Sequence, residues 1–130
     1  MGILNKIFGG EESGEKDDFE WQMISSEEDL ENILAASNYK PQIVFKHSTR
    51  CATSYFSRVS LETLSESDKV KVECNMVDVI QNRPVSTFIS EKLHIRHESP
   101  QLFIIHEGRV VWHGSHQDVK VEKIESFLRN

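Results

Sequence analysis

The stretch QIVFKHSTRCATS, from Gln42 to Ser54, joins a strand-forming run to a cysteine and to the start of a helix-forming run. Its first six residues include the β-branched and aromatic run Ile43-Val44-Phe45 and follow Pro41, a pattern typical of a buried strand. Beyond the cysteine, apolar residues recur at helical spacing and predict a helix from just after Cys51 to about Ser65. These apolar positions are Tyr55, Phe56, Val59 and Leu64. Cys51 is therefore expected at the N-terminus of a helix, directly after a strand.

Strand and helix signals alternate on both sides of this stretch. Residues 19–24 predict a short strand, and residues 25–36 predict a helix with Ser25 and Glu28 as a capping box. A strand at 70–79, a helix after Pro84, and a hairpin of strands at 102–105 and 110–112 follow. A last helix is expected to be capped by Ser115 and Asp118 and to bury the apolar residues between 121 and 128.

The predicted order is βαβαβαββα. Its βαβ units need parallel strands joined by right-handed crossovers, and the hairpin adds antiparallel strands to the same sheet. Such a mixed central sheet carries helices on both faces. With Cys51 at the start of the helix after the second strand and Pro100 opening the hairpin, this α/β arrangement resembles the thioredoxin fold.

Length and charge narrow the class of protein. A chain of 130 residues fits one compact domain. With 15 Lys and Arg against 21 Asp and Glu, the net charge of −6 disfavours nucleic-acid binding, which needs clustered positive charge. No apolar run is long enough for a membrane span, so we expect no membrane partner. We expect a flexible leader and acidic, Gly-rich linker at 1–18, and a folded domain at 19–130.

The start of the chain lacks the long apolar core of a secretory signal, and Lys6 stands where a myristoylation signal has Ser or Thr. Two cysteines, Cys51 and Cys74, make at most one disulfide bond. A reducing cytoplasm is therefore the expected location. Cys74 alternates with apolar residues in a predicted central strand and is expected in the core rather than near Cys51.

A reactive Cys51 needs its thiolate stabilised, because the thiolate is the nucleophile. The N-terminus of the following helix supplies free N–H groups, and Arg50, Lys46 and His47 supply neighbouring positive charge. In two-cysteine oxidoreductases a second thiol stands three residues on, but here that residue is Ser54. Ser54 and Thr53 can donate hydrogen bonds to the thiolate but cannot resolve a disulfide, so a thiol from elsewhere must do so.

Pro100 provides a second signal. In this fold the peptide bond before the proline that opens the hairpin is cis, and its loop faces the cysteine. We therefore predict a cis Ser99–Pro100 bond, with the backbone of Ser99 placed to pair with an extended substrate segment. On base rates alone, a trans proline that starts an edge strand would be favoured.

Six histidines do not form a metal-binding pattern such as HxxxH or HxH, and no metal site is expected. Arg96, His94 and His97 lie in the loop before Pro100, and His116 follows the hairpin. Solvated loop residues are the default interpretation of these side chains. The alternative is a positive rim around the cysteine that binds an anionic group.

Three stretches resemble the monothiol bacilliredoxin family: IVFKHSTRC at 43–51, SPQLFIIHEGRVVWHGSH at 99–116 and the leader MGILNKIFGG. The resemblance implies a thioredoxin-like fold and a nucleophilic Cys51 that removes bacillithiol from S-thiolated client proteins. A second low-molecular-weight thiol then regenerates Cys51, and no cofactor is bound. The residues do not exclude a small thiol other than bacillithiol as the co-substrate. Thr49, Ser99 and Pro100 are expected to contact substrate. Its carboxylates would suit a positive rim, for which the candidates are Arg50, Lys46 and Arg96. We expect a monomer.

Two other functions stay open from the sequence. A thioredoxin-fold adaptor or redox sensor would bind partners through the Pro100 loop while Cys51 is merely modified. Alternatively, Cys51 and a small thiol would ligate an iron–sulfur cluster, as in single-thiol glutaredoxins. The residues Cys51-Ala52-Thr53-Ser54 depart from the CGFS sequence of that group, which disfavours the cluster.

Overall fold

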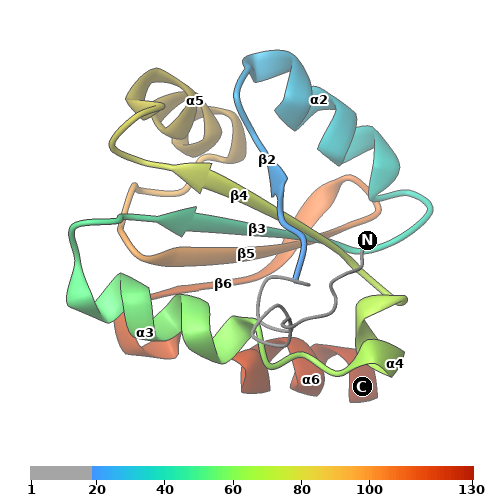
Figure 1. The fold of residues 1–130 in the computed structure, drawn as a ribbon. Coiled ribbons are helices and arrows are strands. Elements are labelled where there is room, and N and C mark those ends of the chain that lie inside the picture. Colours follow the sequence, from blue (N-terminus) through green and yellow to red (C-terminus); the bar gives the residue numbers. More distant parts are fainter. Residues whose placement is uncertain (1–18) are drawn as a thin grey trace, which may run out of the picture.

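A five-stranded mixed sheet forms the centre of the protein, in the computed structural model that describes residues 19–130. The strand order is β2-β4-β3-β5-β6. Helices cover both faces, with α2 and α5 on one side and α3, α4 and α6 on the other (Figure 1). This is the α/β arrangement with a thioredoxin-like topology that the sequence predicts. The expected leader and linker at 1–18 lie outside the described residues.

The register of the strands brings the ends of β3 and β4 to one edge of the sheet. β3 (Gln42–His47) pairs in parallel with β4 (Glu73–Asp78), with His47 opposite Asp78. β3 also pairs antiparallel with β5 (Gln101–His106), which forms a hairpin with β6 (Arg109–Ser115). The short β2 (Gln22–Met23) pairs in parallel with β4. The chain therefore leaves β3 and β4 at the same edge, where α3 and α5 begin.

Alternate residues of β3 point to opposite faces of the sheet, and each face has its own hydrophobic core. Ile43 and Phe45 pack on the face covered by α3 (Ala52–Leu61), α4 (Glu66–Lys69) and α6 (Val121–Arg129). Val44 packs on the face of α2 (Glu27–Ala36) and α5 (Arg83–Leu93). All six residues of β3 are buried, as expected for a central strand covered on both faces. The strand that leads to Cys51 is thereby fixed from both sides.

Several helix boundaries differ from the predicted ones. The capping box of α2 is one residue later, with Ser26 as N-cap and Asp29 bonding back to it. α3 ends at Leu61 and a separate short helix, α4, follows. Before α6, residues His116–Asp118 form a 3₁₀ turn, so Ser115 and Asp118 do not cap that helix. The shifts reflect several competing polar side chains near each helix start.

Two strand expectations were also too long. The first predicted strand reduces to Gln22–Met23, and β4 begins at Glu73 instead of Val70, which is exposed.

Within the part of the chain that the structure describes, no helix has the length and apolar character needed to cross a membrane.

Candidate active site around Cys51

Cys51 is the N-cap residue of α3 and follows the end of β3 by four positions. Its backbone N–H donates to the Ser48 carbonyl at 3.3 Å, and its own carbonyl accepts from the Tyr55 N–H at 3.0 Å. The first N–H groups of a helix have no partner within the helix, and they carry the positive end of its dipole. Cys51 thus lies at the N-terminus of a helix directly after a strand, as predicted.

Cys51 opens onto a cavity of about 280 Å³ that Ser99 also lines. Ser99 comes from the loop before β5, and the Ser99–Pro100 peptide bond is cis. The carbonyl of Pro100 accepts from the His116 N–H at 2.9 Å, which ties the loop to the end of the hairpin. Cysteine and cis-proline loop therefore meet at one cavity, as the sequence analysis expected of Ser99 and Pro100.

Gln101 shapes this loop, a role that the sequence analysis missed. Its side chain is buried, accepts from the Glu98 N–H at 3.1 Å and donates to the Arg96 carbonyl at 2.9 Å. Both bonds hold the backbone just before Ser99. A polar residue at the start of an otherwise apolar strand, directly after proline, is the signal that could have identified it.

Ser54 bonds to His47 rather than to the sulfur. Its hydroxyl lies 2.7 Å from His47 Nδ1 and accepts from the Ser48 N–H at 3.0 Å. No hydrogen bond joins Cys51 Sγ to Ser54 or Thr53 among residues 19–130. Ser54 is fully buried and fixes the turn that carries Cys51. The predicted bond from Ser54 to the thiolate is thus replaced by a positioning contact.

His47 is not a cation beside Cys51, contrary to expectation. Its side chain is buried against Phe45 and α3, with ring centroids of Phe45 and His47 5.3 Å apart. Burial, the largest cause, and the charge of Arg58 lower the pKa of His47, which favours the neutral imidazole.

Lys46 does not line an open rim. Its side chain is fully buried under α5, on the face of β3 opposite to His47. Nζ donates to the Ser86 carbonyl at 3.0 Å and the Ser90 hydroxyl at 2.7 Å, and lies 3.0 Å from His97 Nδ1. The prediction of an accessible Lys46 was wrong because neighbouring residues of a strand point to opposite faces.

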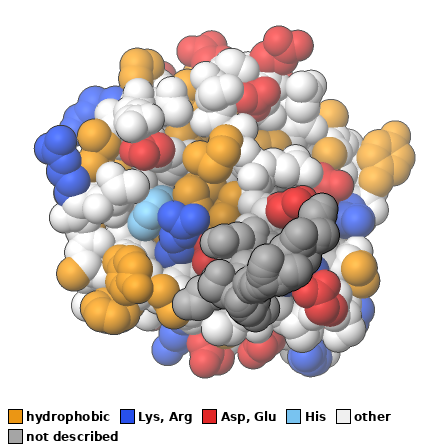
Figure 2. All heavy atoms as spheres, in the orientation of Figure 1, with side chains coloured by type: hydrophobic (Ala, Val, Ile, Leu, Met, Phe, Trp, Pro, Cys, Tyr) orange, Lys and Arg blue, Asp and Glu red, His pale blue; other side chains and the backbone are white. Residues whose placement is uncertain are grey.

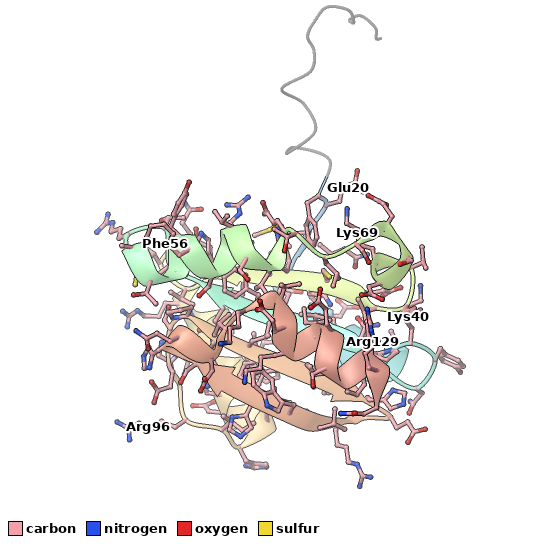
Figure 3. The ribbon with its side chains drawn as sticks, turned by 90° about the horizontal axis from the view of Figure 1, so that it is seen from below. Glu20, Lys40, Phe56, Lys69, Arg96 and Arg129 are labelled. Atoms are coloured by element: carbon pink, nitrogen blue, oxygen red, sulfur yellow. The ribbon has the colours of Figure 1, made fainter. Side chains whose placement is uncertain are left out.

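The remaining predicted residues differ in their position. Arg50 and Thr49 are exposed beside Cys51, and Thr53 is half-buried in the first turn of α3. Thr49 lines a separate groove with His47 and Arg58, away from the cavity. Arg96 is exposed and extends outward at the end of the molecule that also carries Phe56 (Figure 3). Neither Arg96 nor Arg50 lines the cavity of Cys51.

Cys74 lies far from the site. It pairs with Ile43, four residues before the end of β3, and four strand residues span about 13 Å. Burial, the largest cause, raises the pKa of the Cys74 thiol to about 12, so it stays protonated. Both cysteines are free. Cys74 packs against the core as a partly buried residue, which agrees with its predicted structural role.

The exposed face of α3 next to Cys51 is apolar. Tyr55, Phe56 and Val59 are 58%, 67% and 46% exposed, although their spacing predicted burial. Ser54, Ser57 and Leu61 are buried in their place. Hydrophobic side chains gather over the start of α3, at the lower left of Figure 2. The helix therefore turns its small polar residues inward and leaves large apolar ones beside the cysteine.

Arg83 was overlooked by the sequence analysis. It is the first residue of α5 and lines the cavity together with Cys51 and Ser99. A signal was present, because helices that follow parallel strands begin at the same sheet edge. A cation directly before Pro84, at the predicted start of a helix, was therefore placed to approach Cys51.

No cluster of three or more His, Cys, Asp or Glu side chains within residues 19–130 is arranged to hold a metal ion.

Comparison with known proteins identifies the family. A model of the monothiol bacilliredoxin BrxC matches residues 22–124. The chain belongs to the monothiol bacilliredoxin family. The match includes Cys51, Ser54, Ser99 and Pro100, which form the site or support it. The resemblance inferred from the three sequence stretches is thereby confirmed.

Solved structures confirm the fold. A structure described as a candidate oxidoreductase with a thioredoxin fold superimposes with a TM-score of 0.71 at 27% identity, covering 81% of this chain and 90% of that one. Thioredoxin from Fasciola hepatica gives 0.64 at 19% identity, covering 83% and 96%. Thioredoxin from Malassezia sympodialis gives 0.66 at 18% identity, covering 85% and 89%. Bacilliredoxin membership and the thioredoxin-like oxidoreductase fold together support a thiol redox function.

Proposed function

We propose that the protein is a single-thiol disulfide oxidoreductase in which Cys51 removes a low-molecular-weight thiol, bacillithiol, from protein mixed disulfides. The observation that carries this proposal is the position of Cys51. It caps α3, opens onto a cavity shared with the cis-proline loop, and has Ser54 where a resolving cysteine would stand. Cys51 can therefore meet a substrate in the cavity, but the residue three positions on is a serine and cannot act as the resolving thiol.

The cycle has two exchange steps. The Cys51 thiolate attacks the sulfur of the small thiol in the client's mixed disulfide, and the client's cysteine leaves as a thiolate that takes up a proton. A new disulfide then joins Cys51 to the small thiol. A second small-thiol thiolate attacks this bond, releasing Cys51 and a disulfide of two small thiols. No bound cofactor takes part, because the electrons come from the second small thiol.

Client proteins would contact two surfaces around Cys51. The backbone of Ser99 can pair with an extended segment that carries the thiolated cysteine. Tyr55 and Phe56 offer exposed apolar area next to the sulfur, of the kind that marks protein contact sites. Arg50 and Thr49 are exposed in the loop just before Cys51, and Thr53 lies in the first turn of α3. We propose that the protein works in the cytoplasm as a monomer, with a thiolated protein and a small thiol as its partners.

The test uses a purified client protein carrying one bacillithiol adduct. Wild type should release the client thiol with turnover in the presence of bacillithiol, and intact mass should show the adduct at Cys51. Cys51→Ser should lower the rate by about a thousandfold or more, because no other thiol reaches the cavity. Cys74→Ser is the matched control and should stay within about twofold. Full activity of Cys51→Ser would overturn the proposal.

The exposed apolar face of α3 also fits a second function, a redox-sensing adaptor that binds partners without turnover. The same experiment separates the two functions. An adaptor would become modified at Cys51 once per molecule and would not release client thiol catalytically.

A further inference from the structure

The cavity beside Cys51 has no carboxylate in its wall, although the chain carries a net charge of −6. Its wall joins the cysteine loop, the end of β4, the first two turns of α5 and the loop before β5. The lining residues are Ser48, Cys51, Val79, Ile80, Arg83, Ser86, Thr87, His97 and Ser99. Polar residues and one cation thus line the same cavity as Cys51, without an acidic side chain among them.

A buried positive charge lies directly behind this wall. Lys46 is fully buried, and its Nζ reaches Ser86 and His97, which both line the cavity. Its three partners are a carbonyl, a hydroxyl and an imidazole, none of which is negatively charged. No ion pair joins Lys46 to a carboxylate within residues 19–130, and Glu98 pairs with His116 instead at 3.2 Å. A buried ammonium without a counter-charge favours an anion nearby.

His97 turns a donor outward from this lysine. An ammonium group has only donors, so His97 Nδ1 must accept from Lys46 and the ring proton is on Nε2. Burial, the largest cause, together with Lys46 and Arg83 lowers the pKa of His97, and the ring stays neutral. Its Nε2–H is therefore available to a ligand on the exposed side of the ring.

The start of α5 adds to the positive potential. Arg83 is exposed at the first helical position, and the N-cap residue Asn82 makes no side-chain cap. Uncapped N–H groups and the helix dipole favour negative charge at this end of a helix. Burial, the largest cause, lowers the pKa of Lys46 to about 8, which still leaves most of this side chain charged at neutral pH.

An orphaned hydroxyl completes the wall. Ser99 Oγ is buried and has no hydrogen-bond partner among the described residues, and Ser99 lines the cavity. Buried polar groups normally have partners, so an unpartnered hydroxyl beside a cavity points to an oxygen or nitrogen of a ligand. It lies in the residue before the cis-proline, on the side of the cavity that the loop forms.

We propose that this cavity binds the carboxylate of an anionic low-molecular-weight thiol while the sulfur of that thiol is bonded to Cys51. Arg83, the Nε2–H of His97 and the Ser99 hydroxyl provide the donors, and Lys46 behind them provides fixed charge. The inference rests on the proposed function and assigns the residues that hold the carboxylate of its small-thiol substrate. It also selects the sulfur that Cys51 attacks, because the small thiol must be the half of the mixed disulfide that stays in the cavity.

The test compares three symmetric disulfides of similar size but different charge: dithiodipropionate, hydroxyethyl disulfide and cystamine. Intact mass follows the rate at which each forms an adduct with Cys51 in the full chain. Wild type should react with the anionic disulfide at least about tenfold faster than with the cationic one. Arg83→Gln should lower the rate with dithiodipropionate about tenfold, which corresponds to one charge-assisted contact, and leave hydroxyethyl disulfide within about twofold.

Arg109→Gln is the matched control, because it removes one exposed cation at the hairpin turn, where β6 starts. It should leave all three rates within about twofold. Equal rates for the three disulfides, or an equal loss for Arg83→Gln and Arg109→Gln, would overturn the carboxylate site while leaving the exchange chemistry of Cys51 intact.

A titration with succinate, which has no sulfur, separates this inference from the proposed function. Succinate should shift the backbone amide NMR signals of Thr87 and Ser99 in wild type and shift them less in Arg83→Gln. If Cys51 reacted with no disulfide, the proposed function would fail, and the succinate shifts would still test the site. Absence of these shifts in wild type would contradict carboxylate binding.

Discussion

Lys46 and His47 are consecutive residues of β3, yet they enter opposite faces of the sheet and meet different helices. The ammonium of Lys46 bonds to Ser86 and Ser90 of α5, whereas the imidazole of His47 bonds to Ser54 of α3. Both side chains are buried and both are bases whose pKa is lowered mainly by burial. Burial nevertheless leaves them in different protonation states at neutral pH.

The difference lies in what each base becomes at neutral pH. The pKa of His47 falls from an ordinary value of 6.5, so the ring is neutral and serves as a hydrogen-bond partner. The pKa of Lys46 falls only to about 8, so most of its charge remains. One face of the strand therefore holds the helix that carries Cys51, and the other supplies fixed charge to the cavity next to it.

The largest stability effect is expected on the His47 face, from Ser54→Ala. The variant leaves His47 Nδ1 and the Ser48 N–H without their partner inside the protein. Unsatisfied buried groups should lower the free energy of unfolding by about 2–3 kcal/mol, measured by urea unfolding. Ser57→Ala is the control, since Ser57 is buried on the same helix. An equal loss of unfolding free energy in both variants would show that the hydrogen bonds of Ser54 do not contribute more than burial of any serine on this helix.

The second prediction concerns Lys46: its burial should make the free energy of unfolding depend on pH in the alkaline range. The folded pKa is about 8 and the ordinary value is 10.5, so between these pH values the unfolded chain binds more protons at this site. Between about pH 8 and pH 9.5 the free energy of unfolding of wild type should therefore rise by about 1–2 kcal/mol relative to Lys46→Met. Exposed Lys120→Met should follow wild type. Parallel pH curves for wild type and Lys46→Met would argue against a charged, buried lysine.

The smallest effect should appear in acid and report on His47. Because its folded pKa lies below 6.5, the unfolded chain binds the extra proton first as the pH falls. Wild type should lose about 1 kcal/mol or less on acidification below about pH 6.5, and His47→Gln should lose less. His113→Gln, at an exposed histidine, is the control and should follow wild type in urea unfolding at each pH. A steeper acid loss in His47→Gln would reverse the assignment.

The position of the site could be predicted from the sequence because local signals agree there. The apolar run at 42–47, the helical spacing after Cys51 and the proline at 100 each define one element, and their order defines the sheet. Cys51 and Ser99 follow from that topology, since the end of β3 and the start of β5 lie side by side. Local pattern and connectivity were sufficient for this part.

The side-chain roles could not be predicted, because they depend on which face a residue enters. All residues of β3 are buried, so no alternation of polar and apolar residues indicated which face Lys46 enters or that a helix covers it there. In α3 the apolar residues Tyr55 and Phe56 suggested the core face, whereas small Ser54 and Ser57 are buried. Close packing of that helix against the sheet favours small residues, a tertiary constraint that spacing does not record.

The separation of the two cysteines along β3 and β4 has a kinetic consequence. Ser54 is bonded to His47, and Cys74 lies about 13 Å from the end of β3 at four residues of strand. On the proposed cycle no unimolecular step can restore Cys51. Each turnover then waits for a collision with a free small thiol, and the steady-state rate follows the concentration of that thiol in the surrounding solution. The turnover rate of the protein would thus depend directly on the concentration of free small thiol around it.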